Sequence, residues 1–268
     1  MKNITTVILA AGRSTRFISS KSKLTHELAG YPIISHVFDS AKKISENIVV
    51  VCNKDNYSEL KNILIGCKLV IQKNQKGTAD AIEVAKKHIK TENFIILFGD
   101  VPLITDKSLK KLIRSFKKNN TGSMIAFETH RPKGYGRVVL NNNKVTKVVE
   151  EINASHDEKL IEFCNSGIML VKKSIFYKNI KLIKFNKKKK ERYLTDIFEI
   201  YFKKNIPFSF VVSSEDEMSG VNNLVDFNKV DSLFQKRIIN KFLEQGVLIK
   251  RPETSYFSYN SKIAKKVV

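Results

Sequence analysis

The first stretch of the chain that could do chemistry is a small, basic loop near its start. Residues 4–10 form an apolar run with β-branched side chains, which is typical of a buried strand. Ala11 and Gly12 then turn the chain, and Arg13 and Arg16 follow in the sequence RSTR. Backbone amides and two guanidinium groups at the carboxyl end of a strand favour an anion. The loop has neither G-x-G-x-x-G nor G-K-[ST], so an ordinary glycine turn and a phosphate site both stay open on this stretch alone.

Further polar residues follow other predicted strands. Residues 47–52, 68–71 and 93–98 are short apolar runs, and they alternate with helix-like stretches that begin near Pro32, Tyr57 and Gly77. This alternation predicts right-handed crossovers and a largely parallel sheet. Ligands of such sheets bind beyond the carboxyl ends of the strands, which is where Gln72 and Asp100 fall.

From about residue 121 the pattern changes. The pattern predicts strands separated by turns at residues 123–127, 136–140, 145–149 and 168–171. We therefore expect an antiparallel or mixed extension of the sheet that covers the open site. Residues 224–245 then show apolar positions at helical spacing, and Gly246 ends that helix.

Composition narrows the class of protein. The chain has 268 residues, enough for a substantial core in one large domain or two small ones. No apolar run approaches the ~20 residues of a membrane span, and the opening segment turns polar too early for a secretory signal, so we expect a cytoplasmic protein with no membrane association. Cys52, Cys67 and Cys164 are scattered, which argues against a disulfide framework or a zinc site.

The chain is strongly basic, with 48 Lys and Arg against 26 Asp and Glu and a net charge of +22. Such an excess suits nucleic acid, an anionic membrane or anionic small substrates. Most of the lysines are dispersed in pairs, as on a solvated face, and the single block at residues 187–190 has no interleaved aromatic residues. We therefore expect no specific nucleic-acid binding.

The motifs together resemble one family, the sugar-1-phosphate nucleotidyltransferases. The resemblance rests on LAAGRSTRF with Lys23 a few residues on, QKNQKGTADA, LFGDVPLI, YGR, VEE, NSGI, RYLTD and GVNN, which occur in the family's order between residue 4 and about residue 255. Within the family it is closest to the uridyltransferase half of the bifunctional enzymes that make UDP-N-acetylglucosamine. It implies an α/β fold of the Rossmann-like nucleotidyltransferase type, a mostly parallel mixed sheet flanked by helices, with a C-terminal helical arm.

The resemblance also implies a role for each matching position. Catalytic cations are expected at Arg16 and Lys23, where the triphosphate lies. Residues expected to bind the nucleotide are Leu9, Ala10, Ala11, Gly12, Gln72, Gly77 and Thr78. Residues expected to hold the N-acetylhexosamine phosphate are Gly136, Glu150, Asn165, Tyr193 and Thr195. Asp100 and Asn222 are expected to hold Mg²⁺, which usually takes only one or two protein oxygens at a phosphate site.

Each motif also has a plain structural alternative. Asp100 and Gly136 could be turn residues, and Asn165 could lie at a strand edge. The remaining candidates suit helix starts, namely Thr78, the pair Thr195 and Asp196, and Asn222.

Three positions depart from the family pattern. Ser14 stands where a second glycine is usual, and Ser22 stands where a proline precedes the lysine. Ile152 stands where many relatives have a lysine, so that cation is either missing or supplied by another residue, with Arg192 as the candidate.

The implied reaction is transfer of UMP from UTP to N-acetylglucosamine-1-phosphate, with release of pyrophosphate. We expect a uridyltransferase domain over residues 1–223 and a helical arm over residues 224–246. In the family, the arm leads to a left-handed β-helix that carries acetyltransferase activity. Residues 247–268 contain no hexapeptide repeat, so we expect only a truncated lead-in to that β-helix there. The sequence leaves open whether the protein forms a homo-oligomer or binds a separate acetyltransferase partner.

Two rival functions remain. The protein could be another sugar-phosphate or alcohol-phosphate nucleotidyltransferase, or a basic nucleic-acid-binding or regulatory relative that has lost catalysis.

Overall fold

The centre of the protein is a group of parallel strands built from the apolar runs of the first hundred residues. The structure, a computed structural model, describes residues 3–12, 17, 22–186 and 190–264. Strand β1 (Ile4–Ala10) is fully buried and pairs in parallel with β4 (Asn47–Cys52) on one side and β6 (Asn93–Phe98) on the other. Strand β5 (Lys68–Ile71) extends the sheet beyond β4, again in parallel. Strands that are apolar along both faces must be covered on both faces, as is usual for parallel sheets.

The second half of the sheet is mixed. Strand β10 (Phe163–Lys172) runs antiparallel to β6 and to β7 (Gly122–Glu128), and β11 (Ser209–Ser213) closes the edge in parallel with β7. A hairpin of β8 (Gly136–Asn141) and β9 (Lys144–Val149) attaches to the start of β10. Among the described residues the strand order is β11-β7-β10-β6-β1-β4-β5, with β8 and β9 branching from β10. The expected fold class is therefore confirmed.

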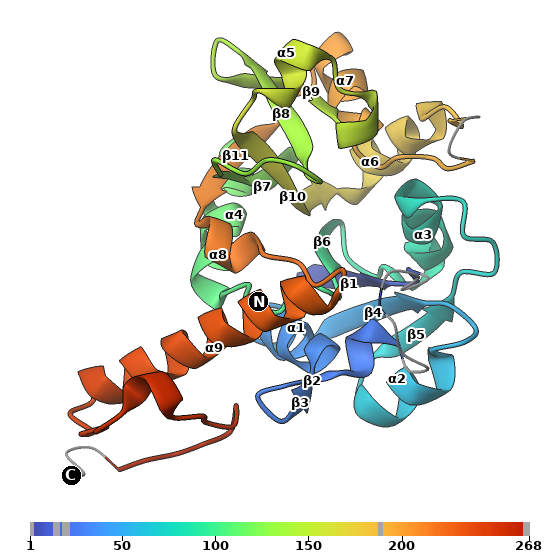
Figure 1. Ribbon diagram of the computed structural model, residues 1–268. Coiled ribbons are helices and arrows are strands. Elements are labelled where there is room, and N and C mark those ends of the chain that lie inside the picture. The colour runs from blue at the N-terminus through green and yellow to red at the C-terminus, as the bar shows by residue number, and fades with distance from the viewer. Residues whose placement is uncertain (1–2, 13–16, 18–21, 187–189, 265–268) are drawn as a thin grey trace.

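Helices cover both faces of this sheet (Figure 1). One apolar cluster joins the sheet to α1 (Ile33–Lys42), α2 (Tyr57–Ile63) and α4 (Asp106–Asn119). A second cluster on the opposite face joins it to α3 (Thr78–Ala85), α6 (Lys173–Asn179) and α7 (Asp196–Lys203). The remaining elements are short: β2 (Glu27–Leu28), β3 (Tyr31–Pro32), α5 (His156–Lys159), α8 (Glu215–Met218), and the 3-10 turns η1 (Lys23–Thr25), η2 (Lys86–His88), η3 (Glu151–Asn153), η4 (Ile180–Leu182) and η5 (Pro252–Thr254).

A third, smaller apolar cluster anchors the C-terminal helix α9 (Leu224–Glu244) to the rest of the protein. Val230 and Phe234 of α9 lie in this cluster with residues of the β2–β3 hairpin and with Leu103 and Val221. Figure 1 shows the far half of α9 extending away from the sheet, with the following segment turning back along it. That segment is tied down by the paired hydrogen bonds of Gln235 with the backbone of Phe257, at 2.9 and 2.8 Å. None of the helices in the described part of the chain is long and apolar enough to cross a membrane.

Most predicted element positions agree with the structure, and the differences have local causes. Helix α9 ends at Glu244 and Gly246 has φ +81°, as its predicted role at the helix end requires. Strand β10 begins at Phe163 rather than at residue 168, because its register shifts between Asn165 and Met169 and interrupts the alternation of side chains. Pro32 belongs to β3 and precedes the first turn of α1 instead of lying in it.

Candidate active site

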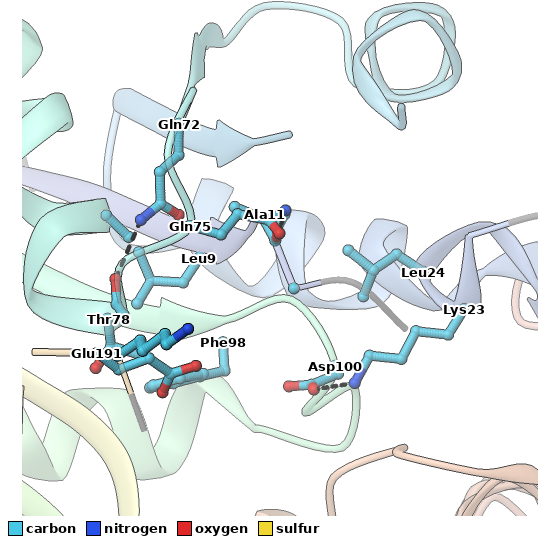
Figure 2. A pocket seen from close by; sticks show the side chains of 15 residues that line it. Leu9, Ala11, Lys23, Leu24, Gln72, Gln75, Thr78, Phe98, Asp100 and Glu191 are labelled. Carbon is cyan, nitrogen blue, oxygen red and sulfur yellow. Dashed lines mark hydrogen bonds and ion pairs between the residues drawn. The ribbon is translucent and has the colours of Figure 1, made fainter. Parts of the chain in front are cut away.

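The carboxyl ends of β1, β5 and β6 surround a cavity of about 570 Å³, to which the N-terminus of α3 also contributes (Figure 2). All seven residues predicted to bind a nucleotide line it, together with Lys23 and Asp100: Leu9, Ala10, Ala11, Gly12, Gln72, Gly77 and Thr78. In Figure 2 Gln72, Gln75 and Thr78 lie at one end of the cavity, and Lys23 and Asp100 lie at the other. The topology thus brings together segments that are about ninety positions apart in the sequence.

The loop after β1 is held by side-chain amides from two neighbouring segments. Asn56 donates a hydrogen bond to the carbonyl of Ala10 at 2.8 Å, and Gln75 donates one to the carbonyl of Ala11 at 2.7 Å. Asn53 donates a longer one to Ala11 at 3.3 Å. These bonds fix the backbone at Ala10 and Ala11 before any ligand is present, which lowers the ordering cost of binding there.

The loop before α3 depends on one glycine. Gly77 has φ +107°, and a Cβ atom there would come within 2.5 Å of the carbonyl oxygen of Arg192. Only a glycine allows this close approach. The side-chain amide of Gln72 donates to the carbonyl of Gly77 at 3.1 Å, so that two of the residues predicted to bind the nucleotide are linked directly.

A second cavity of about 340 Å³ adjoins the first. All five residues predicted to hold the sugar phosphate line it, with Asn222: Gly136, Glu150, Asn165, Tyr193 and Thr195. Four residues line both cavities: Thr78, Phe98, Asp100 and Glu191. The two cavities therefore share a wall, and Asp100 stands at their junction.

Glu150 contributes a carboxylate to the second cavity. Burial raises the pKa of Glu150, although the hydroxyl of Thr195, which donates to its Oε1 at 2.8 Å, acts in the opposite direction. Burial also raises the pKa of Asp196 to about 6, and the nearby charge of Glu150 adds to this. The protonation of Glu150 in the cavity and of Asp196 near it thus changes closer to neutral pH than usual.

Lys23, Asp100 and the segment before α9 converge on one point. Lys23 Nζ lies 2.5 Å from Asp100 Oδ2 and donates to the carbonyl of Val221 at 2.8 Å. The backbone amide of Val221 in turn donates to the carbonyl of Asp100 at 2.8 Å, which places Asn222 beside the same site. The two residues predicted as metal ligands thus line the same cavity, and Asp100 also shares the first cavity with the loop after β1.

The donor set suits a hard divalent cation that shares its coordination shell with a substrate. Asp100 offers a carboxylate and Asn222 an amide, while the described residues contain no group of three or more His, Cys, Asp or Glu that could hold a metal. Mg²⁺ at phosphates commonly takes one or two protein oxygens and keeps water and phosphate for the rest. The residues present therefore fit Mg²⁺.

Two of the plain structural alternatives are wrong. Thr78 does not cap α3, because its hydroxyl accepts from the amide of Leu194 at 3.0 Å. The side chain that caps α9 belongs to Asn223, not Asn222. The pair Thr195 and Asp196 does stand at a helix start, because Thr195 occupies the N-cap position of α7, although its hydroxyl bonds to Glu150 instead of a helix amide.

Arg192 does not supply the cation expected near residue 152. Its guanidinium forms ion pairs with Asp80 at 2.9 Å and with Glu83, both on α3. Burial would lower the pKa of Arg192, but the hydrogen bonds to Glu83 and Asp80 outweigh it and raise the pKa above its ordinary value. Ile152 is exposed and does not line either cavity.

Three polar residues of the first cavity were missed from the sequence, and one predicted residue cannot be placed. Glu191 lines both cavities and Lys190 lines the first; the signal was their position directly before the RYLTD motif. Gln75 was also overlooked, although it lies inside the QKNQKGTADA segment. The predicted catalytic residue Arg16 lies outside the described residues.

Comparison with known proteins agrees with this geometry. The family model of the MobA-like NTP transferase domain matches residues 6–166. The chain is 34% identical over 264 residues to the bifunctional protein GlmU of Campylobacter fetus subsp. fetus, covering 96% of this chain and 59% of that protein. It is 33% identical over 274 residues to the bifunctional protein GlmU of Bartonella quintana, covering 100% of this chain and 61% of that protein. The chain therefore spans about three fifths of the length of these relatives.

Solved structures with low sequence identity share the fold. A Bacillus anthracis protein described as a glucose-1-phosphate thymidylyltransferase, in complex with sucrose, superimposes with a TM-score of 0.68 at 17% identity over 86% of this chain and 94% of that one. A CMP:2-keto-3-deoxy-manno-octonic acid synthetase in complex with CTP gives a TM-score of 0.66 at 16% identity, over 88% of this chain and 99% of that one. The resemblance inferred from the motifs is confirmed by the match to the family model and by the GlmU relatives, and the chain belongs to the family of MobA-like NTP transferase domains.

Proposed function

We propose that this protein transfers UMP from UTP to N-acetylglucosamine-1-phosphate, forming UDP-N-acetylglucosamine and pyrophosphate. The observation that supports this most is the pair of adjoining cavities. One is lined by all seven residues predicted for the nucleotide and the other by all five predicted for the sugar phosphate, and they meet at Asp100. Such a product would be a precursor of cell-wall polysaccharide, made in the cytoplasm.

In the proposed reaction an oxygen of the sugar phosphate forms a bond to the α-phosphorus of UTP. The bond from that phosphorus to the oxygen shared with the β-phosphate breaks, and pyrophosphate leaves with the electron pair. The nucleophile is already ionised near neutral pH, so no general base is required. The work of the protein is to align two polyanions and to offset the charge that grows on the leaving group.

The described residues divide this work between the two cavities. Lys23 would contact the triphosphate, and the amides of the loop at Ala11 and Gly12 would bind phosphate oxygens. Gln72 and the backbone at Gly77 would contact the base. In the second cavity Glu150 would accept a hydrogen bond from a sugar hydroxyl while Thr195 holds its other side.

Asp100 and Asn222 would hold Mg²⁺, which would neutralise the phosphates of the two substrates when bound. The fit rests on the hard oxygen donors and on the position of Asp100 at the junction of the cavities. Arg16 would add a second cation to the triphosphate.

Pyrophosphate release tests the proposal. The protein is incubated with Mg²⁺, each of the five common nucleoside triphosphates, and N-acetylglucosamine-1-phosphate, glucose-1-phosphate or an alcohol phosphate, and the product is identified by mass spectrometry. We expect turnover with UTP and N-acetylglucosamine-1-phosphate above every other pair. Asp100→Asn, which keeps the shape but removes the charge, should lose most of that turnover while the protein stays folded.

Other results would reject the assignment in different ways. Preference for another nucleotide or phosphate would favour a different nucleotidyltransferase activity. No turnover with any pair, together with salt-sensitive retention of DNA or RNA, would favour the nucleic-acid-binding rival.

A further inference from the structure

One part of the wall between the two cavities is a segment without regular secondary structure, which supplies Glu191 to the residues that line both cavities. Residues 190–195 contribute Lys190 and Glu191 to the first cavity, and Glu191, Tyr193, Leu194 and Thr195 to the second. Apart from one isolated bridge between Asn186 and Glu191, no sheet pairing holds this segment. Its position must therefore come from other contacts.

The backbone of the segment is attached to the loop that begins α3. The amide of Arg192 donates to the carbonyl of Lys76 at 2.7 Å, and the carbonyl of Arg192 accepts from the amide of Ala79 at 3.2 Å. The amide of Leu194 donates to the hydroxyl of Thr78 at 3.0 Å. These three bonds join the segment to residues 76–79, of which Gly77 and Thr78 line the first cavity.

The guanidinium of Arg192 extends this attachment in two directions. On α3 it bonds Asp80 at 2.9 Å and Glu83. On the other side Nη2 donates to the carbonyl of Ile180 at 2.8 Å and Nε to that of Ile183 at 3.3 Å. The side chain is only 16% exposed, so solvent screens these contacts little. All three guanidinium nitrogens are engaged, a planar arrangement that a lysine cannot reproduce.

We infer that Arg192 is a positioning residue that fixes the wall between the two cavities and so sets the affinity for the second substrate. The inference rests on the proposed function and concerns a residue that does not itself line either cavity. It acts through its neighbours on both sides, Glu191 and Tyr193, and through Thr195, which in turn bonds Glu150.

The two cavities depend on this wall to different extents. The nucleotide cavity keeps its walls from β1, β5 and β6 when the segment moves, because the loop after β1 is held by Asn56 and Gln75. The second cavity draws four of its lining residues from the segment. Loss of Arg192 should therefore weaken binding of the sugar phosphate more than binding of UTP.

The experiment compares Arg192→Ala and Arg192→Lys with the wild-type protein, and uses Arg114→Ala as a matched control because Arg114 is exposed on α4, away from both cavities. Steady-state kinetics with both substrates is measured beside amide hydrogen exchange. For Arg192→Ala we expect the KM for the sugar phosphate to rise by between about 10-fold and about 100-fold, the range that misplacement of contact groups by about 1 Å can produce. The KM for UTP and kcat should change by less than about 3-fold.

Hydrogen exchange reports on the wall without reference to turnover. The amides of residues 192 and 194 should exchange faster in Arg192→Ala, while sheet amides such as those of Val7 and Ile96 keep their protection. In Arg192→Lys, the exchange rates at residues 192 and 194 should lie between those of the wild type and Arg192→Ala. One ammonium group can reach the carboxylates of α3 or the carbonyls of Ile180 and Ile183, but not both. A double change of Asp80→Asn and Glu83→Gln should reproduce the same exchange pattern with Arg192 intact.

Three outcomes would overturn the inference. These are unchanged exchange at residues 192 and 194, faster exchange throughout the sheet, and a fall in kcat with both KM values unchanged. If the wild-type protein does not turn over UTP and N-acetylglucosamine-1-phosphate, the proposed function fails, while the exchange result still decides whether Arg192 holds the wall.

Discussion

At the scale of single residues, the closest contact in the site joins a predicted phosphate ligand to a predicted metal ligand. Lys23 Nζ lies 2.5 Å from Asp100 Oδ2, and the two side chains are 11% and 22% exposed. One carboxylate oxygen cannot accept a hydrogen bond from an ammonium group and coordinate a divalent cation at the same position. Without a nucleotide, Lys23 would therefore compete with a metal ion for Asp100, whereas the phosphates of a nucleotide would draw Lys23 away and favour metal binding.

This competition predicts an unusual effect of removing the lysine. In Lys23→Met, the affinity for Mn²⁺ without nucleotide should rise by about 10-fold, a modest part of the attraction expected between partly buried charges. With UTP present, the same variant should bind Mn²⁺ no better than the wild-type protein. Titration of free Mn²⁺ by electron paramagnetic resonance measures both. Lys42→Met is the control, because Lys42 pairs with Asp39 on the surface. Equal Mn²⁺ affinity of Lys23→Met and wild type without UTP would contradict the competition.

A second prediction at this scale concerns pH. Burial raises the pKa of Glu150, and the hydrogen bond from Thr195 offsets part of that rise. Thr195→Val removes the offset, so the pKa of Glu150 should rise further and the ionised form should be lost at a higher pH. The acid limb of kcat/KM for the sugar phosphate should therefore move to higher pH. Thr146→Val removes a hydroxyl bonded to the carbonyl of Val139 in the hairpin and should leave that limb in place.

At the scale of elements, α9 is part of the support of the site as well as an extension from it. Phe234 and Val230 pack against Leu103, which follows Asp100, and against Val221, which precedes Asn222. The ring of Phe234 also contacts His36, at 4.8 Å between ring centroids. A domain boundary at residue 223, as drawn from the sequence, separates the helix from the cluster that positions these two loops.

Two phenylalanines of α9 test this role. Phe234→Ala and Phe242→Ala both remove buried rings and should each lower the free energy of unfolding by about 3–5 kcal/mol. Only Phe234→Ala should also weaken Mn²⁺ binding in the presence of UTP, because Phe242 packs on Phe257 at the far end of the helix. Urea denaturation and Mn²⁺ titration measure the two effects. A similar loss of Mn²⁺ affinity in both variants would mean that α9 acts only through overall stability.

The sequence predicted elements well where local patterning decides them. The apolar runs gave β1, β4, β5 and β6, and the helical spacing after Asn223 gave α9 with its end at Gly246. The start of β10 could not be predicted, because Gly167 at φ +78° breaks the alternation of side chains. Short β11 carries serines at both ends and owes its place to pairing with β7.

Within the site, motifs predicted which residues line the cavities but not how those residues pair. The contact of Lys23 with Asp100 joins residues that lie 77 positions apart, and that of Arg192 with Asp80 joins residues 112 positions apart. Such pairs depend on how the sheet brings loops together. For that reason the sequence suggested the wrong place for the Arg192 guanidinium and gave no role to Glu191.

At the scale of the whole molecule, the net charge of +22 acts on the fold and on the substrates in opposite directions. An excess of one sign destabilises a compact state by self-repulsion, and the same field attracts polyanions such as nucleoside triphosphates. Added salt screens both effects. Raising ionic strength from about 0.01 M to about 0.1 M shortens the screening length from about 30 Å to about 10 Å.

We therefore expect the same rise in NaCl to increase thermal stability and to weaken nucleotide binding. Each gain of about 1 kcal/mol in the free energy of unfolding would raise Tm by about 2–4 °C for a protein near this size. Differential scanning calorimetry and isothermal titration with UTP measure the two trends in the same buffers. A neutral ligand such as N-acetylglucosamine serves as the control, because its affinity should not follow the salt concentration. A Tm that falls as NaCl rises would mean that attractive ion pairs, such as Arg192 with Asp80 and Glu83, outweigh the repulsion among the dispersed lysines.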